Sequence, residues 1–191
     1  MEPKTYQLFV PPEAIASKSH RDWSKKEAQC YFVWLTECLE QRVVGLFDFL
    51  GIAQAERMGA RELLADVGAR AAKALADPAC STMGKDGEPV LTNLGYSLAA
   101  DIGLLTAKLI LDVAGDQVKW DILRKPKSDV SYNLPVLTGI GWDTYDPVGV
   151  SVADAAAVLA GRRASDAWVK VFDSCVADAQ RWMVPSRGHH E

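Results

Sequence analysis

The stretch "LTNLGYSLAADIGLLTAKLILDVAG", Leu91–Gly115, decides the fold because it is the most apolar part of the chain. Apolar residues cover most of the circumference of a helix built from it, and a helix of this kind is packed by neighbours on most sides. We therefore expect residues 91–114 to form a central helix of the core. Its polar residues recur at steps of four, four, seven and four along one narrow stripe: Asn93, Ser97, Asp101, Lys108 and Asp112.

A membrane span is the alternative for so apolar a stretch. Spanning a bilayer needs about 20 predominantly apolar residues, and charges near the middle of a span are costly. Asp101, Lys108 and Asp112 interrupt the run. The pattern therefore favours a buried helix in a water-soluble protein that has no contact with a membrane.

Other helices are predicted around this one. Ser24 and Glu27 have the spacing of a capping box, and an apolar face of period 3.6 follows them up to Leu50. Residues 60–75 show a second amphipathic pattern. Two further helices are predicted to begin after N-cap serines, Ser151 and Ser165. The prediction is about five helices arranged around the central apolar helix.

Two short runs predict strands. Gln117–Leu123 alternates apolar and polar residues, and a second run begins at Pro135. They are expected to form a small antiparallel ribbon, which is marginal alone and must either lie on helices or gain Tyr6–Val10 as a third strand. Residues 81–89 are predicted to be a loop from their Gly, Asp and Pro content. The fold class is mainly α with a minor β part, in a single globular domain over residues 1–191 with a mobile tail from about residue 185.

Composition excludes several classes of function. Asp and Glu number 25 against 21 Lys and Arg, which argues against a nucleic-acid partner because such binders carry a basic excess. The four cysteines form no C-x-x-C pair, and two of the three histidines lie in the last three residues, so no metal site is expected. The beginning of the sequence does not have the pattern of a signal peptide, and unpaired thiols favour the cytoplasm.

Catalytic motifs are also missing, and no cofactor is implied. No phosphate-binding glycine pattern or nucleophile elbow occurs, and the polar surroundings of His20 favour a solvated side chain over a catalytic base. Arg42 is the odd cation on the apolar face of the first long helix, as Asp101 is the odd acid on the central one. Three interpretations stay open for Arg42 and Asp101: a buried ion pair, the polar floor of a small-molecule pocket, or catalysis. The buried ion pair is favoured.

A second group of residues surrounds the predicted ribbon. Aromatic and cationic side chains together are typical of protein interfaces, and they can also hold an anion or stack on a base. The competing interpretation is a charged hairpin loop that keeps the ribbon soluble. With a net charge of −4, we favour this loop or a protein contact. The candidate binding residues are Trp120, Arg124, Lys125, Lys127, Tyr132, Trp142 and Tyr145.

Four patches of the chain resemble a group of stand-alone bacterial proteins of uncharacterised function: "EAQCYFVWLTECLEQRVVGLFDFL", "LTNLGYSLAADIGLL", "VKWDI" and "NLPVLTG". The patches cover about a third of the chain and contain no catalytic signature. The resemblance implies no established activity. By analogy, some small bacterial proteins of this general kind neutralise a toxin encoded beside them.

The sequence therefore predicts a non-catalytic cytoplasmic bacterial protein that binds another protein or self-associates. An immunity-like neutraliser of a toxin is one form of such a binder. The alternative is a small-molecule-binding protein or enzyme with a polar pocket around Asp101 and Arg42. A pocket protein should show a cavity that contains Asp101, whereas a partner binder should show exposed apolar residues instead.

Overall fold

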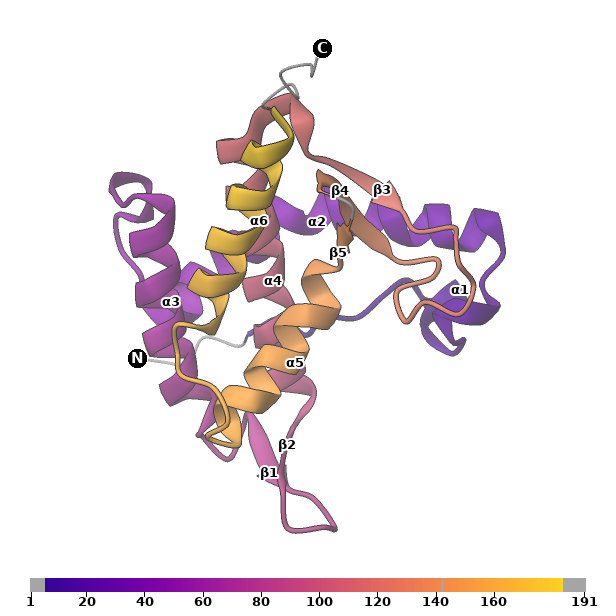
Figure 1. Ribbon diagram of the computed structural model, residues 1–191. Coiled ribbons are helices and arrows are strands. Elements are labelled where there is room, and N and C mark those ends of the chain that lie inside the picture. The colour runs from indigo at the N-terminus through magenta and orange to yellow at the C-terminus, as the bar shows by residue number, and fades with distance from the viewer. Residues whose placement is uncertain (1–5, 142, 184–191) are drawn as a thin grey trace.

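The computed structural model describes residues 6–141 and 143–183 and confirms a mainly α fold with a small antiparallel β part (Figure 1). Within these residues, no helix is both long and apolar enough to cross a membrane. The predicted mobile tail lies outside the described residues. The helices are α1 (Glu13–Ala16), α2 (Lys25–Leu50), α3 (Ala60–Leu75), α4 (Asn93–Ala114), α5 (Pro147–Leu159) and α6 (Ala167–Met183), with short 3-10 turns at His20–Asp22, Ala55–Arg57 and Gly115–Gln117. The strands are β1 (Ser81–Met83), β2 (Pro89–Leu91), β3 (Lys119–Ile122), β4 (Pro135–Ile140) and β5 (Asp143–Tyr145).

The predicted capping box starts α2. The backbone N–H of Glu27 donates to the Ser24 hydroxyl at 3.2 Å, and the Glu27 carboxylate accepts from the backbone N–H of Ser24 at 2.8 Å. Lys18 also donates to Glu27, and this contact with the Ser24 bonds lowers the pKa of Glu27 to about 2. Arg42 lies on the buried face of α2 among apolar residues. Because α2 packs against α4, the fold brings the Arg42 side chain to α4.

The helix α4 packs against α2, α3, α5 and α6 (Figure 1). Thr92 caps its start by accepting from the N–H of Gly95 at 3.2 Å. A side chain on Gly103 would place its Cβ 2.1 Å from the Pro147 carbonyl oxygen, so only glycine allows α5 to lie this close. The Lys108 ammonium donates to the Glu40 carboxylate on α2 at 2.7 Å, so its hydrogen bond joins two helices. The polar stripe of α4 therefore faces α2 and the N-terminal segment.

The sheet has the order β3–β4–β5, and all its pairs are antiparallel. The predicted ribbon is confirmed, with Trp120 opposite Leu137. The prediction that Tyr6–Val10 adds a strand is wrong, because these residues form no strand and β5 takes that place. Their backbone groups are bound by side chains instead: the Phe9 N–H donates to the Ser97 hydroxyl at 2.8 Å.

Two other local predictions are corrected. Residues 81–89 are not a plain loop, because β1 and β2 pair as a hairpin that closes through the Gly84 N–H and the Glu88 carbonyl at 2.7 Å. Ser151 does not cap a helix, since α5 begins four residues earlier, after Asp146. Ser151 is buried within α5, where its hydroxyl donates to the Ala99 carbonyl at 2.6 Å and accepts from Trp168 at 2.8 Å.

Candidate functional site

The side chains of Arg42 and Asp101 meet in a buried, two-pronged ion pair. The guanidinium donates from Nε to Oδ1 at 2.6 Å and from Nη2 to Oδ2 at 2.7 Å. Its remaining donors reach the carbonyl oxygens of Leu8 at 3.1 Å and Gln7 at 2.9 Å. The Tyr6 hydroxyl also donates to the Asp101 carboxylate. The pair therefore ties the N-terminal segment to α2 and α4.

The electrostatics of this cluster match a closed structural contact. Burial raises the pKa of the Asp101 carboxyl, and the Arg42 guanidinium and Tyr6 hydroxyl oppose this effect. Burial also raises the pKa of the Tyr6 hydroxyl, and the neighbouring Asp101 charge raises it further, so this hydroxyl stays protonated. Asp101 is only 1% exposed. No part of the carboxylate is therefore presented to a ligand in solution.

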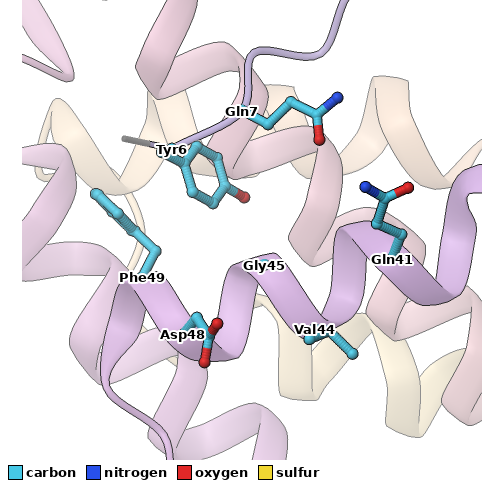
Figure 2. Close-up of a pocket in the computed structure, with 7 residues that line it drawn as sticks. All are labelled: Tyr6, Gln7, Gln41, Val44, Gly45, Asp48 and Phe49. Carbon is cyan, nitrogen blue, oxygen red and sulfur yellow. The ribbon is translucent and has the colours of Figure 1, made fainter. Parts of the chain in front are cut away.

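A shallow groove lies next to this cluster but does not include the ion pair. It measures about 440 Å³, and neither Arg42 nor Asp101 is among its lining residues, which are Tyr6, Gln7, Gln41, Val44, Gly45, Asp48 and Phe49. Figure 2 shows the Tyr6 ring over α2 beside Phe49, and the two ring centroids are 4.6 Å apart. The structure thus shows the ion pair, and the 1% exposed Asp101 does not open into this groove.

The loop between β3 and β4, residues 123–134, is held by a network centred on Asn133. The Oδ1 atom of Asn133 accepts from Arg124 at 2.9 Å, and the Nδ2 atom donates to the carbonyl oxygens of His20 and Trp23, each at 3.0 Å. Asn133 is 1% exposed and has a φ of 69°, a conformation that asparagine tolerates better than most residues. Sequence reasoning missed Asn133, because a single asparagine in a polar loop gives no local sign of burial.

Two further contacts hold the same loop. The Nδ1 atom of His20 lies 2.8 Å from the Tyr132 carbonyl oxygen, and since a carbonyl only accepts, Nδ1 carries the proton. The Ser131 hydroxyl donates to Asp146 at 2.8 Å. The expectation that His20 is merely solvated is wrong, because the fold brings Tyr132 to it from 112 residues away.

The predicted binding residues do not form one surface. Lys125 and Lys127 are exposed, whereas Trp120, Arg124 and Tyr132 are half-buried. Tyr145 is 6% exposed because β5 directs it into the core, so the expectation that it belongs to a recognition surface is corrected. Trp142 lies outside the described residues. An apolar side chain that was not singled out, Val130, is 74% exposed on the same loop as the two lysines.

Behind this loop lies a cavity of about 430 Å³, which we call the Asp146 pocket. Its walls come from the N-terminal segment, α2, the start of α4, the β3–β4 loop and the start of α5. The lining residues are Pro11, Lys18, Ser19, His20, Trp23, Tyr31, Leu35, Tyr96, Val130, Leu134, Pro135, Asp146, Val148 and Gly149. Aromatic and apolar side chains predominate, and Lys18, Ser19, His20 and Asp146 are the polar ones, a composition typical of small-molecule sites.

One role of Asp146, the capping of α5, could have been inferred from the local sequence. It caps α5 by accepting from the Gly149 N–H at 2.9 Å, and Pro147 occupies the first helical turn, which is a common start signal. Burial raises the pKa of its carboxyl, while the Gly149 and Ser131 bonds and the His20 ring lower it. The position of Asp146 beside Trp23 and Tyr31 depends on the tertiary fold alone.

Other reactive groups do not add a site. Among residues 6–141 and 143–183, no group of three or more His, Cys, Asp and Glu side chains is arranged to hold a metal ion. The four cysteines are free thiols. Cys30 is exposed, whereas Cys80 and Cys175 are buried.

Compared with known proteins, the chain matches no protein-family model, no curated protein and no solved structure.

Proposed function

We propose that this is a non-catalytic, cytoplasmic bacterial protein that binds another protein through its β3–β4 loop. The contact surface is formed by Lys125, Lys127, Val130 and Tyr132, and we call it the loop surface. The observation that supports the proposal is a loop that carries a 74% exposed valine and two exposed lysines while a buried network fixes its backbone. A loop already ordered loses little conformational entropy when it binds.

The composition of the loop surface indicates the chemistry of the partner. Lys125 and Lys127 favour an acidic partner surface, and Val130 needs an apolar hollow beside it. A secreted or delivered toxin neutralised in the cytoplasm is one partner of this kind. Free thiols in all four cysteines support a reducing compartment.

The closed state of the Arg42–Asp101 pair supports protein binding over a ligand pocket at these two residues. Every oxygen of Asp101 and every nitrogen of the guanidinium is bonded within the protein. A ligand would have to displace bonds that hold the N-terminal segment in place. We assign the pair an architectural role, and we propose α4 as the central helix around which the others are arranged, since four helices pack against it.

The test compares partner capture by matched variants in lysate of the source bacterium. Two variants change the loop surface, Val130→Asp and Lys125→Glu with Lys127→Glu. The control is Met83→Asp, which places the same charge on a 65% exposed apolar residue of the β1–β2 hairpin, away from the loop (Figure 1). The proposal expects one protein to be captured by the wild type and the control and lost from both loop variants. Equal capture by all four proteins would refute the loop surface.

A further inference from the structure

A second binding function is encoded in the Asp146 pocket, which shares Val130 but no other residue with the loop surface of the proposed protein contact. We infer that this pocket binds a small organic cation, an ammonium group on a compact apolar body. The cavity of about 430 Å³ has the size of a small-molecule site. Two features of its walls determine the ligand class: a carboxylate without an ion-pair partner and a set of aromatic rings.

The carboxylate of Asp146 lacks a cationic partner. Its two oxygens accept from neutral donors, the Ser131 hydroxyl and the Gly149 N–H, and no ion pair of Asp146 is formed among the described residues. Asp146 is half-buried, and a carboxylate that is partly removed from water is stabilised when an opposite charge lies near it. His20 is close enough to influence Asp146 but directs its Nδ1 proton to the Tyr132 carbonyl. A ligand cation would supply the missing charge.

Aromatic rings surround the same space. Trp23, Tyr31 and Tyr96 line the pocket, and the ring centroids of Trp23 and Tyr31 are 5.0 Å apart. The faces of such rings attract ammonium groups, most strongly where water is excluded. Rings and a carboxylate together favour a cation with apolar substituents over a small hydrated metal ion, which needs several oxygen ligands.

An anionic ligand fits the pocket less well. Lys18 lines the pocket, but its ammonium already donates to the carboxylate of Glu27, which is not a lining residue. The first open amides of α5, which attract anions at other helix starts, are occupied here by Asp146 itself. The charge left unpaired in the pocket is negative.

The ammonium group that the pocket binds can belong to either of two kinds of ligand, a free metabolite or a Lys side chain of a protein partner. Binding is measured by calorimetry on the purified protein, with no partner present, so the outcome is independent of the capture test. The probes are choline and phenethylammonium chlorides for a free amine, N-acetyl-lysine amide for a side chain, and 3,3-dimethylbutanol as the neutral counterpart of choline. Tighter binding of the free amines than of the lysine amide identifies a metabolite, and the reverse order identifies a side chain.

Variants link binding to Asp146. Asp146→Asn removes the charge while an asparagine still caps the helix, so folding is kept and cation affinity falls about tenfold or more. The matched control Asp112→Asn neutralises an exposed acid on α4 and leaves the affinity unchanged. Tyr96→Ala removes an aromatic ring that lines the pocket, so it weakens cation binding several-fold. The inference is overturned if no cationic probe binds, if 3,3-dimethylbutanol binds as well as choline, or if Asp146→Asn binds choline like the wild type.

Discussion

Arg42 and Asp101 lie 59 residues apart in the sequence and meet through two hydrogen bonds of 2.6 and 2.7 Å. The same guanidinium holds the carbonyl oxygens of Gln7 and Leu8. One ion pair therefore joins α2, α4 and the N-terminal segment, and its loss should be felt at all three.

The variant Asp101→Asn should lower the free energy of unfolding by about 3–5 kcal/mol, because it leaves a buried guanidinium without its counter-charge. Urea unfolding measures this loss, and hydrogen exchange should show faster exchange at the Phe9 amide. The double variant Arg42→Met with Asp101→Leu removes both charges and should be more stable than the single variant. A single variant within about 1 kcal/mol of the wild type would contradict a structural role for the pair.

Two glycines form a matched test of helix packing. Gly45 has open space where a Cβ would stand, so Gly45→Ala should raise the free energy of unfolding by about 0.5–1 kcal/mol through helix propensity alone. Gly103→Ala places a Cβ 2.1 Å from the Pro147 carbonyl oxygen and should destabilise the protein, because α5 must move away from α4. Thermal unfolding of both variants checks the contrast. Equal effects of the two alanines would show that α5 does not lie against Gly103.

Asn133 should control the order of the β3–β4 loop. Asn133→Ala loses three side-chain hydrogen bonds and places a residue that disfavours positive φ at 69°, so proteolysis within residues 123–134 should become faster. Asn133→Gly is the control, since it keeps the backbone conformation and loses only the bonds. Limited proteolysis should rank the alanine variant as most susceptible, then glycine, then wild type. An alanine variant as resistant as the wild type would argue against a loop fixed by this network.

The pH dependence of stability tests the burial of Asp146. Burial raises its pKa in the folded protein above the ordinary value of 3.8, so above that pH the folded state holds more protons at this group than the unfolded state. Its contribution to stability is therefore full below the ordinary pKa and is lost as pH rises through the folded pKa. The variant Asp146→Asn does not titrate there, so its stability relative to wild type should increase with pH across this window.

Urea unfolding at a series of pH values measures the effect. Tyr31 and Tyr96 face the same carboxyl and keep their protons over this range, because burial raises the pKa of both. The His20 ring influences the Asp146 carboxyl, so the double variant His20→Gln with Asp146→Asn is compared with His20→Gln alone. If the stability of the Asp146→Asn variant relative to its parent fell as pH rises, the Asp146 carboxyl would not be desolvated in the folded protein.

The sequence by itself determined the mainly α fold class, the start of α2 and the extents of the helices with a strong apolar period. These features depend on contacts within a turn or two, such as the Ser24–Glu27 capping box, and the residues that make them are neighbours in the chain. The alternation in β3 was readable for the same reason. The ion pair of Arg42 and Asp101 was foreseeable as one of three alternatives, because each residue is conspicuous on an apolar face.

Only the tertiary structure decided which polar groups found distant partners. Tyr6–Val10 has the composition of a strand, yet Arg42 and Ser97 bind its backbone and remove it from the sheet. Ser151 resembles an N-cap, but a carbonyl of α4 and an indole of α6 draw its hydroxyl into the core. The Asp146 pocket is built by five segments far apart in the chain. Such choices depend on the free energy of burying polar groups, which long-range packing sets and local pattern does not contain.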